Sequence, residues 1–259
     1  VDFLFEDDRV CGVKGYDENK TKFNINARIV IDAGGRNSIS LRRLNLKKNY
    51  SVRGKVALAA HWEGVKIPES YCYMHISHPG YTGIAPVGDN RANVVLVVEN
   101  GYLTGKNIDN YFRKTVLNNK LRREILDSGE PAEKARVINS LAYSVKPPQC
   151  GGLLLVGDAT GFIDPFTGEG IYLSLRSSQL ASAVVKNAFD RSDFSKGCLK
   201  HYDRIRGNEF NKKIILSRIL QRLICSPPLC IRVVKMLANE TELSSLLIGV
   251  IGDYIPANK

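Results

Sequence analysis

The residues with the clearest chemical potential lie between positions 157 and 170, directly after a short apolar run. Asp158 follows the run LLLV at 153–156, whose wholly apolar character is typical of a strand buried on both faces of a parallel sheet. A carboxylate at the carboxyl end of such a strand sits where open α/β sheets bind ligands, and it can accept hydrogen bonds from sugar-like hydroxyls. We therefore expect Asp158 to contact a hydroxyl-bearing ligand.

Two glycines near the end of this segment predict the close approach of a planar ring to the backbone. Gly168 and Gly170 flank Glu169 at the start of a long helical pattern from about 169 to 189. The absence of side chains lets backbone N–H groups reach a ring, and a helix start carries a partial positive charge that favours electron density on a ring carbonyl or an anionic ring. Glu169 is expected to satisfy the helix dipole rather than to act as a base.

The same segment has other interpretations. A Gly-Asp turn between a strand and a helix is common in α/β proteins, so the turn alone is equally compatible with a structural role. The stretch from Gly152 to Gly157 lacks the lysine of a P-loop, which argues against triphosphate binding. No GxGxxG follows a strand in this sequence, so nothing here predicts a site for the ADP half of a dinucleotide.

The surrounding patterns are those of a mixed α and β protein. Residues 1–32 alternate apolar and polar side chains, which predicts a β-meander whose last strand, ARIVIDA, runs into AGGRNS and a short helix. Gly, Pro and Asn turns separate four expected strands between about 53 and 100, and this favours an antiparallel sheet. Further along we expect a helix over 107–127, a strand over 136–144, and helices over 195–248 that break at SPP, 226–228.

Several motifs together resemble one family. GDATGFIDPFTGEGI, at 157–171, looks like the second flavin-binding signature of the geranylgeranyl reductase family, which belongs to a flavoprotein group that includes aromatic hydroxylases and flavin-dependent halogenases. ARIVIDAGGRNSISLRRL is similar to the family's middle signature, and PGYTGIAPVGDNRANVV to its substrate-domain strand pair. The ending LLIGVIGDYIPANK is similar to the tail of many such reductases, so the resemblance extends over nearly the whole chain.

The resemblance implies FAD as cofactor. By it, Asp158 would hold the ribityl chain, while Pro165, Gly168 and Gly170 would lie beside the isoalloxazine ring. The full set of implied FAD-binding residues is Gly157, Asp158, Gly161, Pro165, Gly168, Glu169, Gly170 and Ile171.

The resemblance also implies an α/β (α+β) fold with three regions. Residues 1–52 and 136–190 would form the C-terminal portion of an FAD-binding Rossmann-like domain, residues 53–135 an antiparallel-sheet substrate domain, and residues 191–259 a C-terminal helical region. The chain opens in what reads as the middle of a β-hairpin. We expect the ADP-binding segment upstream of Val1, and this stretch alone to bind FAD weakly and to be inactive.

Two departures from the family pattern bear on partners. Gly34 stands where the family commonly has an acid, so the electron donor stays open between NAD(P)H and a ferredoxin-like protein. Asp32, two residues earlier, is expected to be a turn or strand-end residue. Thr82 and Gly83 stand where many members have a large aromatic, which implies a different or roomier substrate pocket.

The implied activity is reduction of a carbon–carbon double bond in an apolar, isoprenoid-like small molecule. One alternative is a flavin monooxygenase or halogenase; Trp62 is the only tryptophan, so the paired-Trp motif of the halogenases is absent from this span. A second alternative is a non-catalytic remnant that acts at a membrane surface or as an interaction protein. No catalytic acid stands out, and His75, Tyr73 and Tyr81 are weak candidates for a proton donor, with packing as the other interpretation.

Composition narrows the partners further. The six cysteines are scattered without metal-ligand spacing, which predicts no metal site and reduced thiols in a cytoplasmic protein. The net charge is +11, but the basic residues are spread along the chain with few aromatic neighbours, so we expect no nucleic-acid partner. We expect the stretch NEFNKKIILSRILQRLIC to place Phe210, Ile214, Ile215, Ile219 and Leu220 on one face and Lys212, Lys213, Arg218 and Arg222 near the other. Peripheral contact with anionic lipid is one use of such a helix, and packing on its own domain with the basic residues solvated is the other.

Overall fold

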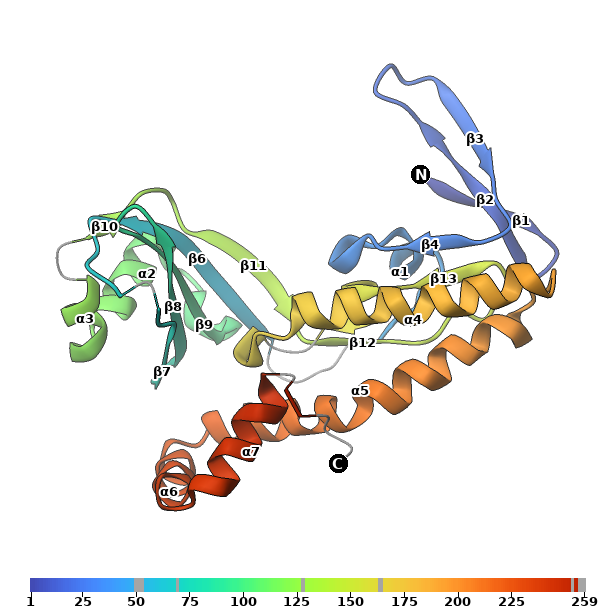
Figure 1. The fold of residues 1–259 in the computed structure, drawn as a ribbon. Helices are drawn as coiled ribbons and strands as arrows, with labels where there is room; N and C mark the ends of the chain where they lie inside the picture. The colour runs from blue at the N-terminus through green and yellow to red at the C-terminus, as the bar shows by residue number, and fades with distance from the viewer. Residues whose placement is uncertain (49–53, 69, 127–128, 163–164, 253, 256–259) are drawn as a thin grey trace. The chain divides into compact units, whose positions relative to one another are not determined.

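The computed structural model describes residues 1–48, 54–68, 70–126, 129–162, 165–252 and 254–255 (Figure 1). The chain divides into two compact units. The first unit comprises residues 1–50, 142–221 and 235–259, and the second, which we call the sheet unit, comprises residues 51–141 and 222–234.

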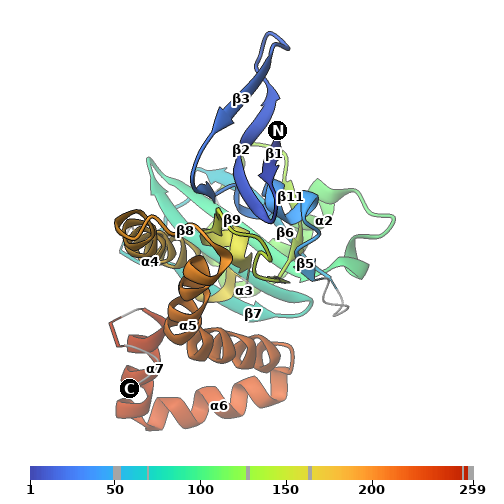
Figure 2. The same ribbon diagram turned by 90° about the vertical axis from the view of Figure 1, so that its right-hand side faces the viewer.

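The first unit opens with the expected β-meander. Strands β1 (Asp2–Glu6), β2 (Arg9–Tyr16) and β3 (Lys22–Asn26) pair antiparallel in the order β1-β2-β3, and they stand out as a twisted ribbon in Figure 2. Phe3 and Val10 are buried from this ribbon and join a core cluster with Leu153 and Leu155. The period-two alternation thus predicts this part of the fold.

A parallel strand pair positions the predicted site. β4 (Val30–Asp32) pairs in parallel with β13 (Leu153–Leu155), with Leu154 opposite Ile31. All three residues of β13 are buried, which confirms the prediction of a buried parallel strand. The last ladder position sets Leu155 opposite Asp32, so the segments that follow the two strands leave the same edge of the pair.

Long helices pack on this strand pair within the first unit. α4 (Gly170–Asp190) buries Ala181 and Val184 in a cluster with Leu154 and with Tyr202 of α5 (Lys196–Ile224). The shorter elements are η1 (Gly35–Asn37), α1 (Ile39–Arg43), β5 (Lys47–Lys48), β12 (Tyr143–Val145), η3 (Gly157–Thr160), β14 (Gly161–Phe162) and η4 (Pro165–Thr167).

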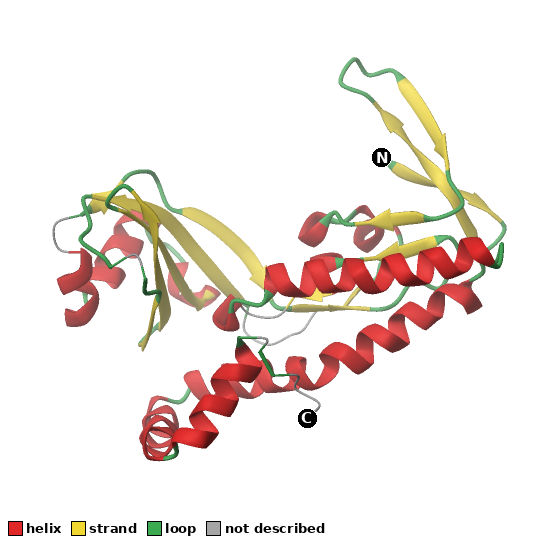
Figure 3. Ribbon diagram, in the orientation of Figure 1, coloured by secondary structure: helices red, strands yellow, loops and turns green. Residues whose placement is uncertain are grey.

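The sheet unit contains the expected antiparallel sheet, coloured yellow in Figure 3. Its path is β10-β6-β9-β8-β7, and β11 also pairs with β6. The strands are β6 (Lys55–Glu63), β7 (Tyr73–Ser77), β8 (Gly80–Gly88), β9 (Arg91–Glu99), β10 (Glu130–Pro131) and β11 (Arg136–Leu141), and η2 (Asn100–Leu103) follows β9.

Two helices cover one face of this sheet. α2 (Ile108–Leu117) and α3 (Lys120–Leu126) replace the single helix predicted over 107–127. The buried Arg122 explains the break, because its guanidinium donates to the carbonyl oxygens of Thr115 and Val116 and so satisfies the end of α2. Trp62 and Phe112 pack edge to face in the core beneath, at 6.5 Å between ring centroids.

The C-terminal helices break where the prolines predict. α5 ends at Ile224, α6 spans Pro227–Asn239 and α7 spans Thr241–Ile251. Within the described part of the chain, no single helix has the length and apolar character needed to cross a membrane, although the bent pair α5 and α6 passes that test by length and composition.

The predicted amphipathic face of α5 is confirmed at Phe210, which is buried, but is wrong at Lys213, Ile215 and Ile219. Lys213 is only 5% exposed, whereas Ile215 and Ile219 are more than half exposed. Phe210, Lys213 and Ser217 lie three and four residues apart and form the buried stripe. Lys213 is buried because it has an anionic partner on α4, described below.

The unit boundaries can be set beside the regions expected from the sequence. The sequence predicts that residues 136–141 belong to the FAD-binding domain. In the structure they form β11 and pair with β6 of the sheet unit. The expected C-terminal helical region divides between the units, with residues 191–221 and 235–259 in the first unit and residues 222–234 in the sheet unit.

Candidate functional site

The turn after β13 is held rigidly by three side chains from three elements. The Gly157 N–H donates to Ser177 Oγ of α4 at 2.8 Å, and Tyr143 Oη of β12 donates to the Asp158 carbonyl oxygen at 2.7 Å. Arg206 Nη1 of α5 donates to Thr160 Oγ1 at 3.2 Å. Burial, then the charge of Asp158, raise the pKa of Tyr143 to about 12, so its hydroxyl keeps the proton that it donates.

The Asp158 carboxylate is not used by this network. It is half-buried, and no group among the described residues donates a hydrogen bond to it. Burial raises the pKa of Asp158, and the positive charge of Arg36 opposes that rise. The Arg36 guanidinium itself lies over the Phe162 ring, 5.4 Å from its centroid. The structure therefore presents a positioned carboxylate with acceptor capacity to spare.

Asp32 shows the opposite arrangement. Its carboxylate accepts from the Gly34 N–H at 2.8 Å, from Ser38 Oγ at 2.6 Å, and from both the N–H and the Oγ of Ser40. Burial acts to raise the pKa of Asp32, but these hydrogen bonds outweigh it and the net shift is downward. Asp32 is thus the expected strand-end residue, and it organises the loop that leads into α1.

The four predicted glycines fall into two pairs. At Gly157, where φ is +57°, an added Cβ would lie 2.8 Å from Ser174 Oγ, and at Gly161 it would lie 3.3 Å from the Tyr143 carbonyl oxygen. Protein packing and backbone conformation account for these two positions. At Gly168 and Gly170 an added Cβ would meet no atom of the described residues within 4 Å, although the φ of +72° at Gly168 also favours glycine there. The second pair therefore borders open space, as a ring-binding surface requires.

Glu169 lies at the start of α4, and its side chain contacts α5. It occupies the N-cap position of α4, but its side chain makes no capping hydrogen bond. Its carboxylate is buried instead, 3.2 Å from Lys213 Nζ, and it accepts from Ser217 Oγ at 3.3 Å. Glu169 lies at the helix start as expected, but its carboxylate pairs with Lys213 of α5 and makes no capping hydrogen bond to α4.

The remaining predicted residues frame the open space. Pro165 begins η4, and its carbonyl oxygen accepts the Gly168 N–H at 3.1 Å. Ile171 lies in the first turn of α4 with its side chain 78% exposed. Asp164, part of the quoted motif, lies outside the described residues.

These features fit a flavin. Asp158 offers a carboxylate for a hydroxylated linker, Gly168 and Gly170 leave room for a planar ring, and the first turn of α4 carries no side-chain cap. The N–H groups of that turn have no acceptor within the helix and favour an anionic group nearby.

The three catalytic candidates do not form one cluster. Tyr73 and His75 alternate along β7 and stack with ring centroids 6.1 Å apart. Tyr81 is paired with Ile76, so its side chain belongs to the opposite face of the sheet. Burial, then the charge of Arg122, lower the pKa of the half-buried His75, which favours its neutral form.

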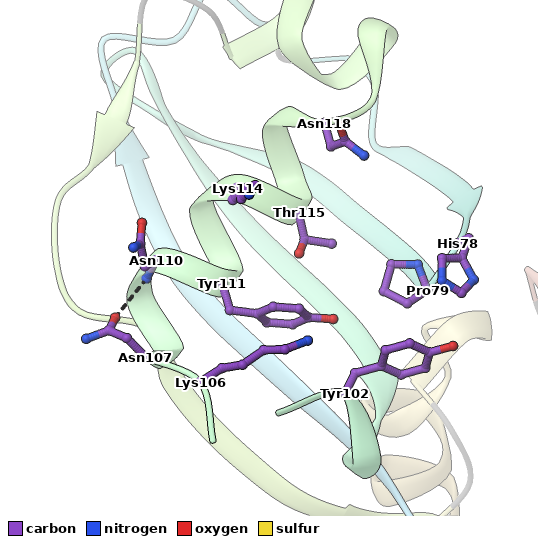
Figure 4. A pocket seen from close by; sticks show the side chains of 10 residues that line it. All are labelled: His78, Pro79, Tyr102, Lys106, Asn107, Asn110, Tyr111, Lys114, Thr115 and Asn118. Atoms are coloured by element: carbon purple, nitrogen blue, oxygen red, sulfur yellow. Dashed lines mark hydrogen bonds between the residues drawn. The ribbon is translucent and has the colours of Figure 1, made fainter. Parts of the chain in front are cut away.

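The sheet unit carries a hollow of its own, shown in Figure 4. It has a volume of about 590 Å³ and lies along α2, with Lys106 Nζ 4.4 Å from the centroid of the Tyr111 ring. It contains none of the residues predicted from the sequence. Among the described residues, no group of three or more His, Cys, Asp or Glu side chains could hold a metal ion.

Comparison with known proteins decides the family. A model of the FAD binding domain matches residues 2–203, which is most of the chain. The chain belongs to this FAD-binding family. The matched span includes the turn after β13, the glycine pair and the whole of α4.

Two named relatives of this family member differ in activity. A digeranylgeranylglycerophospholipid reductase from Thermoplasma volcanium is 29% identical over 80% of this chain and 53% of its own length. A 1H-pyrrole-2-carbonyl-(peptidyl-carrier protein) chlorinase from Pseudomonas fluorescens is 26% identical over 71% of this chain and 44% of its own. The chain thus spans about half the length of these curated relatives.

A solved structure shares the fold. The flavin-dependent brominase Bmp2 superposes with a TM-score of 0.84 over 97% of this chain and 63% of its own, at 14% identity. The mixed α/β architecture with antiparallel strands and C-terminal helices is therefore that of an FAD-binding protein.

Sequence reasoning missed the residues that hold Asp158 and Glu169 in place. Arg36 beside Asp158, Tyr143 beneath it, and Lys213 with Ser217 beneath Glu169 were not identified as part of the site. The sequence does indicate that Lys213 and Ser217 lie on one helix face, because they are four residues apart. Nothing in the sequence pairs that face with Glu169.

Proposed function

We propose that this chain holds the ribityl linker and the isoalloxazine ring of FAD in an FAD-dependent oxidoreductase. The observation that carries the proposal is the pairing of a half-buried carboxylate, Asp158, with the open space beside Gly168 and Gly170. Bound FAD would supply the electron-transfer chemistry, as cofactors of this class do.

The chain's own residues bind and orient. Asp158 accepts hydrogen bonds from the linker hydroxyls, while Ser177, Tyr143 and Arg206 keep its backbone in place. The N–H groups of the first turn of α4 would favour the negative charge that a bound flavin gains on reduction.

The reaction we favour is reduction of a carbon–carbon double bond in an apolar, isoprenoid-like substrate. Support comes from relatives named as digeranylgeranylglycerophospholipid reductases. Further support comes from a hollow of about 280 Å³ in the sheet unit, where Ile76, Val97, Ile224 and Ile231 contribute apolar walls. NAD(P)H and a ferredoxin-like protein are the two candidate electron donors.

A flavin halogenase or monooxygenase is the second candidate. The chlorinase relative and the brominase fold favour it. Against it, Trp62, the chain's only tryptophan, is fully buried in the sheet core against Phe112.

One experiment separates the candidates. The full-length protein is purified, its visible spectrum is recorded for bound flavin, and the reduced protein is mixed with a geranylgeranyl lipid under anaerobic conditions. A reductase reoxidises its flavin and yields a product two mass units heavier. Reoxidation only with oxygen, giving a hydroxylated or halogenated product, supports the second candidate. A colourless protein that ignores added FAD contradicts both.

A further inference from the structure

The loop that carries Gly168 and Gly170 is fastened to α5 by a buried ion pair. Glu169 Oε1 lies 3.2 Å from Lys213 Nζ, and the two side chains are 5% and 6% exposed. Lys213 Nζ also lies 4.7 Å from the centroid of the Tyr172 ring, and Ser217 Oγ donates to the Glu169 carboxylate. Charged pairs are rarely buried this deeply, because removing two ions from water is costly.

The position of the pair gives it a specific effect on the open space. Glu169 is the residue between the two glycines that border that space, so a fastened Glu169 fixes the direction in which both glycine backbones face. A buried lone carboxylate at the start of α4 would cancel the helix's positive end, and a buried lone ammonium would add to it. With both ions present, their charges offset each other and the start of α4 keeps its own positive electrostatic potential.

We propose that Glu169 and Lys213 are positioning residues that orient the Gly168–Gly170 loop against the flavin ring and set its reduction potential through their charge balance. This inference rests on the proposed function, because it presumes that FAD binds at this loop. It adds a role for α5, which carries Lys213 and Ser217 but neither Gly168 nor Gly170.

Three variants of the full-length protein test the charge balance. Glu169→Gln leaves Lys213 uncompensated, so the reduction potential of bound FAD is expected to rise, because reduction adds negative charge near a new positive one. Lys213→Met leaves Glu169 uncompensated, so the potential is expected to fall. The double variant removes both charges, and its potential is expected to return close to that of the unmodified protein.

The measurements are FAD affinity by titration and reduction potential against a reference dye at pH 8. The alkaline pH matters, because burial without a partner cation disfavours the ionised form of a carboxylate. Each single variant is also expected to bind FAD about tenfold or more weakly, since the loop loses its anchor.

A matched control lies on the same two helices. Arg176 of α4 and Glu209 of α5 form an ion pair at 2.8 Å whose side chains are about one-third exposed. Glu209→Gln removes the same kind of charge from a solvated pair, so it is expected to leave the potential and FAD affinity unchanged. A merely structural role for the buried pair would lower thermal stability in its variants without moving the potential.

Opposite shifts in the two single variants, with recovery in the double variant, support the proposal. Unchanged potentials in proteins that still bind FAD overturn it, and so do shifts of the same sign. If a single variant does not fold, the exchanged pair E169K/K213E keeps a buried pair and moves the positive charge to the loop. Its potential must then rise, and an unchanged value overturns the proposal. Failure of the unmodified protein to bind FAD refutes the proposed function instead.

Discussion

Strands β4 and β13 pair in parallel, and each leads into a carboxylate, Asp32 at the end of β4 and Asp158 just past the end of β13. Asp32 is engaged by four hydrogen bonds from its own loop, and its pKa is lowered. The Asp158 carboxylate receives no hydrogen bond from the described residues, and its pKa is raised by burial. The difference teaches that one carboxylate stabilises the protein, while the other keeps the acceptor capacity that the proposed FAD site requires.

The largest expected effect lies on the structural side of this comparison. Asp32→Ala leaves the buried donors of Ser38 and Ser40, and the Gly34 N–H, without their acceptor, which should cost about 3 kcal/mol or more of the free energy of unfolding. Denaturant unfolding of the FAD-free protein measures this loss. The same measurement on Asp158→Ala should give a change within about 0.5 kcal/mol. Equal losses of unfolding free energy in the two variants would contradict the different roles of the two carboxylates.

The two glycine pairs test the same contrast between a packed position and an open one. Gly157→Ala must hold a φ of +57° and push against Ser174, so it should lower the free energy of unfolding by about 1–3 kcal/mol. Gly170→Ala meets open space at a helix start and should leave stability unchanged or raise it by up to about 1 kcal/mol.

Flavin affinity should rank the glycine variants differently from stability. Gly170→Ala is expected to weaken FAD binding about tenfold, because its methyl group occupies the space beside the ring. Thermal unfolding and FAD titration of both variants provide the check. A Gly170→Ala protein that binds FAD normally would argue that the ring lies elsewhere.

How far the sequence predicts this architecture depends on the distance between partners. The buried strand at 153–155, the break at the prolines after Ser226 and the position of Asp158 follow from local patterns, because periodicity, proline and a strand end are local properties. The burial of Lys213 does not follow from any local pattern. It depends on Glu169, far away along the chain, and the exposed Ile215 and Ile219 give the opposite impression of which helix face is buried.

The division of the 107–127 helix has the same cause. From the local sequence Arg122 is expected to be an ordinary exposed helix residue. Its guanidinium instead donates to two carbonyl oxygens at the end of α2 and to Ser77 Oγ of β7. Tertiary contacts of this kind override local helix propensity. For the same reason, sequence reasoning identified Asp158 but not Tyr143, which holds its backbone from another strand.

The smallest expected effect concerns pH. Asp32 has a lowered pKa in the folded state, so its contribution to stability is present above the ordinary aspartate pKa of 3.8 and is lost as the pH falls through its folded pKa. Asp158 has a raised pKa, so the folded state binds its proton more tightly and stability declines as the pH rises from 3.8 through the folded value.

Asparagine variants measure the two contributions. Asp158→Asn should therefore stabilise the FAD-free protein slightly at pH 7, by roughly a few tenths of a kcal/mol, and lose that advantage below pH 3.8. Asp32→Asn should show the reverse sign, with its deficit largest at neutral pH. Unfolding curves between pH 3 and pH 7 test both, and parallel curves for the two variants would contradict the assignment.

The most direct measurement is FAD retention by the full-length protein with and without the Asp158 carboxylate. The unmodified protein should keep FAD through gel filtration and show the visible bands of bound flavin. Asp158→Ala should fold with unchanged stability yet bind FAD at least tenfold more weakly in a fluorescence titration. An Asp158→Ala protein that retains FAD as firmly as the unmodified protein would contradict the central claim.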